Sequence, residues 1–173
     1  MELMFEITEE DYIKFNMHHL ENSPSQKKTF NLLRYIIPLL FSLPIYVIGT
    51  SLLKQPETYW IIIAVLFSAG WIIMYPNQYK RLIKQQTKKL LQEGDNSSIF
   101  GKKVMTINEK DIIVVSENSS EITSKENIKE VKIYDDMILI YLSGITAHII
   151  PSRYLDEETK KELLEELSYS NKF

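Results

Sequence analysis

The sequence predicts an α+β membrane protein in which a two-helix transmembrane hairpin is joined to a small antiparallel β barrel or sandwich closed by a C-terminal helix. Three observations lead to this fold class: two long uncharged runs, a series of short β-type runs after residue 98, and a final amphipathic pattern. A length of 173 residues suffices for one small domain and an appendage. The mean hydropathy of −0.15 averages over these contrasting parts.

The uncharged runs have the length of membrane-spanning helices. No charge occurs in residues 35–53, which read YIIPLLFSLPIYVIGTSLL, or in residues 59–75, which read YWIIIAVLFSAGWIIMY. A helix needs about 20 mostly apolar residues to cross the hydrocarbon core. The alternative is a pair of buried core helices, but a chain of this size cannot cover two helices that are apolar on every side.

The link between the runs, KQPET, is short enough to make the two helices an antiparallel hairpin. Basic residues flank the outer ends of the hairpin, whereas the link itself carries Lys54 beside Glu57. Because cytoplasmic flanks are enriched in lysine and arginine, both termini are expected in the cytoplasm. We therefore expect a multi-pass protein of the plasma (inner) membrane. The flanking residues are Lys27, Lys28 and Arg34 before the first span and Lys80, Arg81, Lys84, Lys88 and Lys89 after the second.

The five basic residues after the second span form the candidate site, which we call the basic patch. One interpretation is a topology determinant on a solvated helix face. The other is contact with anionic lipid headgroups, worth about 1 kcal/mol for each basic residue near the surface. The two interpretations are compatible. Nucleic acid is not expected as a partner, because the membrane competes for this surface.

Four segments are predicted along the chain. A cytoplasmic N-terminal strand and amphipathic helix come first, followed by the hairpin, a basic juxtamembrane helix with a linker, and a cytoplasmic β domain with a C-terminal helix. These segments are residues 1–34, 35–75, 76–97 and 98–173, with spans at 35–53 and 59–75.

The N-terminal segment opens with an alternating pattern. Residues 2–7 read ELMFEI, which predicts a short strand. Thr8 and Asp11 have the spacing of a capping box, so a helix is expected to follow and to end near Asn22, before Pro24. A helical wheel places Asp11 on the charged face of this helix. The opposite, apolar face comprises Tyr12, Ile13, Phe15, Met17 and Leu20.

The C-terminal segment alternates short β-type runs with turn signals, which predicts a barrel or sandwich. Residues 155–167 read LDEETKKELLEEL, an amphipathic helix that Asp156 can cap. Strands closed by one C-terminal helix have the order of a pleckstrin-homology-like (PH-like) domain, and the N-terminal strand is a candidate addition to its sheet. The runs are residues 103–107, 112–116, 121–123, 128–134, 137–142 and 146–150, and the inward helix residues are Leu163, Leu164 and Leu167.

The charge of this segment argues against phosphoinositide binding. Residues 102–173 carry 10 basic and 14 acidic side chains, a net charge of −4. The first turn, residues 108–111, holds two acids and one base, whereas a headgroup site needs a basic hairpin. Protein–protein contact, or packing on the membrane helices, fits this domain better.

Three stretches resemble the YcxB-like family of small bacterial membrane proteins. They are DYIKFNMHHLENSP at residues 11–24, the hairpin with its basic helix, and the stretch from IKEVKIYDDMILIYL to HIIPSRYL at residues 128–155. The resemblance implies a two-span inner-membrane protein with a cytoplasmic PH-like domain. It brings no established enzymatic activity and no catalytic residues.

Motifs that carry chemistry are not found in the sequence. The chain has no cysteine, and its five glycines form no phosphate-binding loop motif. His18 and His19 are adjacent, so on a helix they point about 100° apart and do not easily hold one ion. Asp135–Asp136 is interpreted as a hairpin turn, and Arg153 as an anchor that pairs with a carboxylate at the strand-to-helix junction. We expect no enzyme activity, metal, cofactor or small-molecule substrate.

Two functional hypotheses remain open. The first is a membrane-anchored cytoplasmic interaction module, whose partners are the lipid bilayer and either another protein or a second copy of the chain. The second is a small protective membrane protein, such as an immunity factor against a membrane-targeting toxin, in which the hairpin itself acts.

Overall fold

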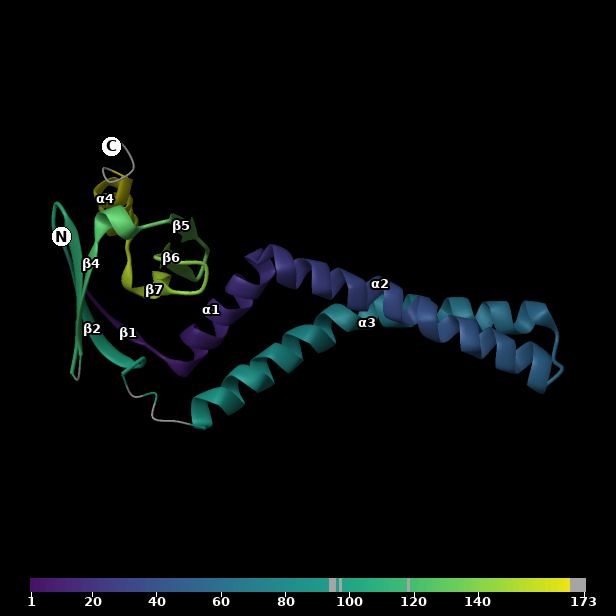
Figure 1. Cartoon of the computed structure of the whole chain (residues 1–173). Coiled ribbons are helices and arrows are strands. Elements are labelled where there is room, and N and C mark those ends of the chain that lie inside the picture. Colours follow the sequence, from purple (N-terminus) through teal and green to yellow (C-terminus); the bar gives the residue numbers. More distant parts are fainter. Residues whose placement is uncertain (94–95, 97, 118, 169–173) are drawn as a thin grey trace. The chain divides into compact units, whose positions relative to one another are not determined.

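The computed structural model describes residues 1–93, 96, 98–117 and 119–168 (Figure 1). It is an α+β chain with two compact units. One unit joins Met1–Asn16 to Thr87–Phe173, and we call it the β unit. The other is Met17–Gln86, and we call it the hairpin unit. The N-terminal strand and the start of the following helix therefore belong to the same unit as the C-terminal half.

The first sheet of the β unit has four antiparallel strands in the order β1-β2-β3-β4. The N-terminal strand pairs with β2, with Leu3 opposite Met105, so the expected addition of this strand to the sheet is confirmed. Alternation along β1 directs Leu3, Phe5 and Ile7 into the core. The strands are β1 (Glu2–Ile7), β2 (Gly101–Ile107), β3 (Asp111–Ser116) and β4 (Ser120–Ser124).

The second sheet has three antiparallel strands in the order β5-β6-β7. A 3₁₀ turn, η2 (Lys125–Asn127), redirects the chain after β4, so β4 and β5 lie in different sheets. The two sheets are not closed into a barrel, and the barrel alternative is therefore wrong. The remaining elements are β5 (Glu130–Ile133), β6 (Met137–Tyr141), β7 (Ala147–Pro151), the 3₁₀ turn η3 (Ser152–Tyr154) and α4 (Glu157–Ser168).

The core of the β unit lies between the two sheets and α4. Strand β6 is buried along its whole length, because both of its faces are covered. Helix α4 contributes Leu163 and Leu167 to this core, as predicted, whereas Leu164 is partly exposed. Asp156 accepts a hydrogen bond from the Thr159 backbone at 2.7 Å, which confirms the predicted cap. Burial of each large apolar side chain contributes about 1.5–3 kcal/mol to folding.

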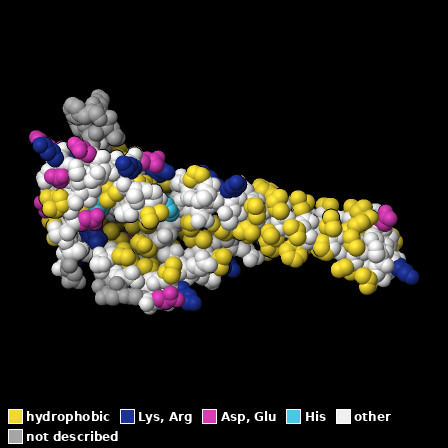
Figure 2. All heavy atoms as spheres, viewed as in Figure 1, with side chains coloured by type: hydrophobic (Ala, Val, Ile, Leu, Met, Phe, Trp, Pro, Cys, Tyr) yellow, Lys and Arg dark blue, Asp and Glu magenta, His cyan; other side chains and the backbone are white. Residues whose placement is uncertain are grey.

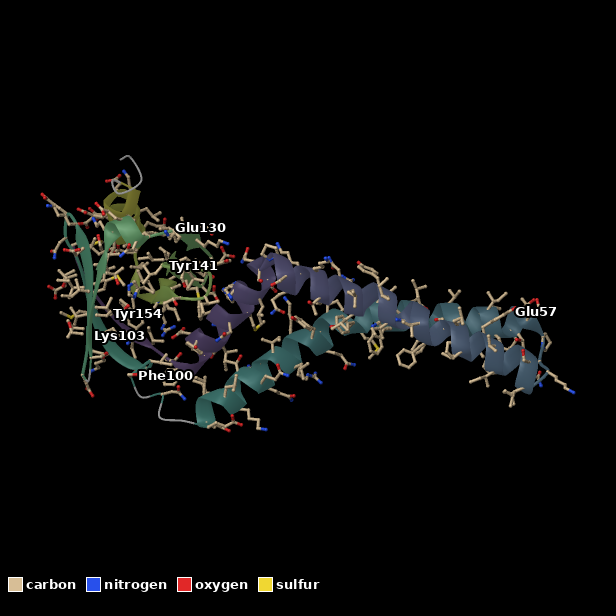
Figure 3. The ribbon with its side chains drawn as sticks, viewed as in Figure 1. Glu57, Phe100, Lys103, Glu130, Tyr141 and Tyr154 are labelled. Carbon is tan, nitrogen blue, oxygen red and sulfur yellow. The ribbon has the colours of Figure 1, made fainter. Side chains whose placement is uncertain are left out.

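The hairpin unit is built from two helices that are long and apolar enough to cross a membrane, residues Pro24–Leu52 and Glu57–Gln92. Figure 2 shows hydrophobic side chains along the visible face of this pair, and Figure 3 places Glu57 at its link end. Its elements are the end of α1 (Glu9–Asn22), α2 (Pro24–Val47), a π-helical turn η1 (Ile48–Leu52) and α3 (Glu57–Gln92) as far as Gln86, where the unit ends.

Helix α3 continues through Pro76, so the second span and the basic helix are one element rather than two. Proline lacks the backbone N–H that would bond the carbonyl four residues earlier, which here is Ile72. The guanidinium Nε of Arg34 on α2 donates to that carbonyl at 3.1 Å. A side chain of the neighbouring helix therefore replaces the missing backbone donor. The sequence marks Arg34 only as a basic residue before the first uncharged run and does not predict this contact.

Small residues lie where α2 and α3 come close together. The hydroxyl of Ser42 lies 2.7 Å from that of Ser68 and 3.3 Å from the carbonyl of Ala64. Near the link, Gly49 packs against the indole of Trp60 so tightly that a Cβ atom would overlap the ring. Close backbone approach at small residues is the usual way in which membrane helices associate.

Candidate functional site

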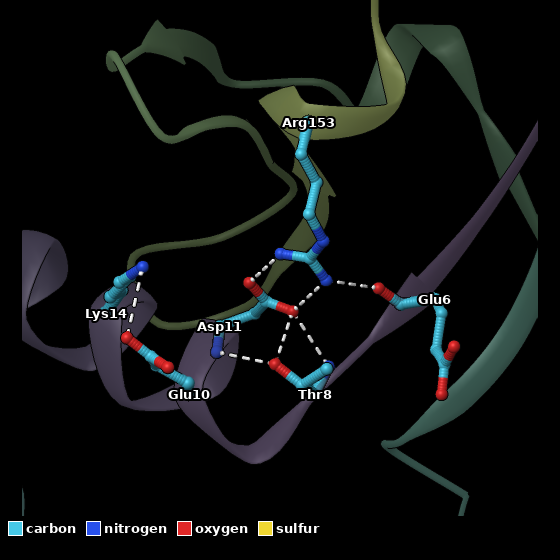
Figure 4. Close-up of polar contacts among 6 residues, drawn as sticks. All are labelled: Glu6, Thr8, Glu10, Asp11, Lys14 and Arg153. Atoms are coloured by element: carbon cyan, nitrogen blue, oxygen red, sulfur yellow. Dashed lines mark hydrogen bonds and ion pairs between the residues drawn. The ribbon is translucent and has the colours of Figure 1, made fainter.

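A clamp of polar side chains joins the start of α1 to the η3 turn after β7 (Figure 4). The Arg153 guanidinium donates to both carboxylate oxygens of Asp11, at 2.6 and 2.7 Å, and to the Glu6 carbonyl at 2.9 Å. Thr8 completes the site, because its backbone N–H and its hydroxyl both donate to Asp11. The predicted carboxylate partner of Arg153 is thereby identified.

Asp11 is only 2% exposed, although the helical wheel groups it with the charged residues of the helix. The helical wheel considers one helix at a time and cannot include a guanidinium from a distant turn. Burial raises the pKa of Asp11, but the hydrogen bonds from Arg153 and Thr8 outweigh it and hold the pKa below its ordinary value. The hydrogen bond to Asp11 raises the pKa of Arg153 further above its ordinary range. These contacts make the site an anchor between α1 and the η3 turn.

The basic patch lies along α3, and all five of its side chains are exposed. Acidic partners lie near part of it. Lys80 pairs with Glu21 at 2.9 Å within the hairpin unit. In the β unit, Lys88 lies 3.8 Å from Glu9 and Lys89 lies 3.8 Å from Glu93. Within the part of the chain that the structure describes, no ion pair is found for Arg81 or Lys84.

A cavity of about 380 Å³ lies at the base of the hairpin, beside Lys80. The end of α1, the start of α2 and the middle of α3 line it, and all of its residues belong to the hairpin unit. Its lining is mostly apolar and includes the charged residues Lys27, Lys80 and Glu21. The sequence did not predict this cavity, because it depends on how three helices pack.

The outer face of the four-stranded sheet presents a continuous apolar surface, which we call the outer sheet face. Pairing places Met4 beside Val104 and Val104 beside Val115, while Ile113 lies opposite Ile122 in the adjacent row. Met4 and Ile122 are 70% and 69% exposed. A large exposed apolar patch is typical of an interaction site. The alternating β pattern was visible in the sequence, but the pairing that makes this face continuous was not.

A second cavity, of about 370 Å³, lies inside the β unit near His148. The ring Nε2 of His148 lies 3.2 Å from the Thr123 hydroxyl. Burial lowers the pKa of His148, with Glu121 opposing this change and Lys103 adding to it. Burial also lowers the pKa of Lys103, which Figure 3 labels, and Glu121 partly offsets the effect. Lys103 and Glu121 thus place one basic and one acidic side chain beside His148 in the lining of this cavity.

The two other histidines lie on α1, within the hairpin unit. Among the described residues, no group of three or more histidine, cysteine, aspartate or glutamate side chains is arranged to hold a metal ion. The Asp135–Asp136 pair lies in the turn between β5 and β6, where Tyr134 donates its backbone N–H to the Met137 carbonyl at 2.9 Å. This pair is a hairpin turn, as predicted.

These features define an α+β protein with two long apolar helices and a two-sheet β unit. Residues 107–167 match the model of a family described as YcxB-like protein, which confirms the resemblance over the segment from the end of β2 to the last turn of α4. No curated protein and no solved structure matches the chain.

Proposed function

We propose that the chain is a membrane-anchored interaction module. In this proposal α2 and α3 cross the plasma membrane as a hairpin with both termini in the cytoplasm. The PH-like β unit presents its outer sheet face to another protein or to a second copy of the chain.

The exposure of the two apolar helices supports the membrane part of the proposal. Of the most apolar stretch of each, 11% is buried in the first helix and none in the second. Large side chains such as Leu39, Leu43 and Leu66 are 63–69% exposed. Soluble proteins rarely expose contiguous apolar surfaces larger than a few hundred Å². Exposure of this apolar surface is favourable when lipid hydrocarbon surrounds the two helices. The basic residues that flank the hairpin favour the orientation with both termini in the cytoplasm.

The outer sheet face is the observation that carries the interaction part. It lies on the part of the chain that would extend beyond the membrane, and acidic residues of the same face, Glu2 and Glu6, border it. An apolar centre with a charged rim is the usual composition of a protein interface.

Cysteine cross-linking in native membranes tests the proposal, because the chain contains no cysteine of its own. Ile122→Cys places a thiol on the outer sheet face, and Lys161→Cys places one on exposed α4 as the matched control. We expect a cross-linked product from the first variant and none from the second. A product of twice the chain mass identifies a second copy, and any other mass identifies a different protein.

Absence of a product at position 122 in membranes that contain the protein would contradict the interaction module. The protective alternative, in which the hairpin itself acts, predicts that outcome together with cell protection that survives Ile122→Ser. Both readouts use the full chain.

A further inference from the structure

We propose that the cavity at the base of the hairpin is a binding site for one anionic phospholipid. Its phosphate lies between the ammonium groups of Lys27 and Lys80, and part of one acyl chain lies against the apolar wall. The inference rests on the proposed membrane location and adds a specific ligand to it.

The size and lining of the cavity fit an amphipathic molecule. Its volume of about 380 Å³ falls within the range of about 300–1,000 Å³ typical of small-molecule sites. Contacts between aromatic rings hold part of the wall in place before a ligand binds. The ring centroid of Phe30 lies 5.1 Å from that of Tyr79 and 5.4 Å from that of Tyr75. The apolar lining consists of Met17, Leu20, Phe30, Pro76, Tyr79 and Ile83.

The charge around the cavity selects an anion. Residues 17–34 and 76–86 of the hairpin unit together carry six basic side chains and one acidic side chain, Glu21. Glu21 pairs with Lys80 at 2.9 Å, with the two side chains 53% and 56% exposed, so water screens this pair and it is weak. A phosphate oxygen brought between Lys27 and Lys80 gains two charge-assisted hydrogen bonds.

The position of the cavity distinguishes a membrane lipid from a soluble anion. Its lining from α2 ends at Asn31, just before the first uncharged run, and its lining from α3 begins at Pro76, just after the second. The cavity therefore lies where apolar helix surface gives way to charged surface, which is the level of lipid headgroups. A free phosphate would leave the apolar wall unused, and a lipid without net charge would leave the excess of lysine unmatched.

Lipid titration of the purified full chain in neutral detergent tests the inference. Short-chain phosphatidylglycerol is added, and the bound fraction is measured by native mass spectrometry, with phosphatidylcholine of the same chain length and inorganic phosphate in parallel. We expect one phosphatidylglycerol per chain, weaker binding of phosphatidylcholine, and no displacement by inorganic phosphate at equal concentration. Equal binding of the two lipids, or displacement by phosphate, would overturn the inference.

Two neighbouring lysines provide a matched pair of variants. Lys27 lines the cavity, whereas Lys28, which is also exposed, is not among its lining residues. Lys27→Gln should weaken phosphatidylglycerol binding about fivefold, while Lys28→Gln should leave it unchanged. If both variants weaken phosphatidylglycerol binding equally, the lipid is attracted to the basic surface in general and the cavity is not a specific site.

Filling the cavity is the second, charge-independent test. Ile83→Trp places a large ring in the cavity and should abolish lipid binding, with Leu20→Phe as a milder variant if the first does not fold. If a variant with a filled cavity folds and still binds the lipid, the cavity is not the binding site. Recovery of the chain in the membrane fraction is scored separately, so a failure of the membrane proposal is distinguished from a failure of the lipid site.

Discussion

Arg153 and Asp11 are 142 residues apart in the sequence and form a bidentate ion pair with nitrogen–oxygen distances of 2.6 and 2.7 Å. The pair joins the capping box at the start of α1 to the η3 turn after β7. It therefore holds the first residues of the chain to the β unit, although the hairpin lies between them in the sequence.

The first prediction concerns this pair. Asp11→Asn should lower the free energy of opening of the β unit by about 1–3 kcal/mol, because the buried carboxylate of Asp11 loses its charge and its bidentate bond to the half-exposed Arg153. Hydrogen exchange of the β6 amides in the full chain measures this opening. Glu10→Gln is the control, since Glu10 pairs with Lys14 at an exposed position and its loss should cost less than about 0.5 kcal/mol. Equal effects of the two variants would contradict the role of the clamp.

The second prediction is a loss of stability of the β unit at acid pH. Burial lowers the pKa of His148 below its ordinary 6.5, so protonation favours the unfolded chain and stability starts to fall near pH 6.5. The hydrogen bonds of Asp11 hold its pKa below 3.8 despite burial, so its contribution is present above that value and is lost as the pH falls below it. The same exchange measurement as a function of pH should show two separate declines.

His148→Gln should remove the decline that begins near pH 6.5 and leave the one at lower pH. If stability still declines near pH 6.5 in this variant, the decline comes from a titratable group other than His148.

The third prediction concerns the closest approach of the two long helices. Gly49→Ala should destabilise the hairpin by about 1–3 kcal/mol, because the added methyl group overlaps the Trp60 indole. Both tryptophans of the chain, Trp60 and Trp71, lie in the hairpin unit, so tryptophan fluorescence during thermal unfolding reports on it. Gly70→Ala is the matched control, since a methyl group there meets nothing within 4 Å. A melting temperature lowered equally by both changes would contradict the packing at Gly49.

The fourth prediction tests the replacement of a backbone donor by Arg34. Arg34→Gln should destabilise the hairpin by about 1–2 kcal/mol, because the Ile72 carbonyl loses its donor. Pro76→Ala restores a backbone N–H for the same carbonyl. The effect of Arg34→Gln should therefore shrink in the Pro76→Ala background, which a double-mutant cycle followed by tryptophan fluorescence measures. Additive effects would show that the two groups do not serve the same carbonyl.

Local patterns in the sequence were sufficient for most elements of the fold. Alternation predicted β1, the turn signals separated the later strands, and the five-residue link predicted the hairpin. The burial of Asp11 and the continuity of α3 through Pro76 are beyond local patterns, because Arg153 and Arg34, which make them possible, lie on distant elements. The open arrangement of the two sheets and the cavity at the base of the hairpin were also beyond local patterns, since both depend on how whole elements pack.

The orientation of the hairpin is the central claim, and a phosphatase fused to the C-terminus of the full chain tests it most directly. The enzyme is active only outside the cytoplasm, and a second fusion within the link at Gln55 serves as the opposite control. The account predicts an inactive C-terminal fusion and an active link fusion, with both proteins recovered in the membrane fraction. An active C-terminal fusion would contradict it.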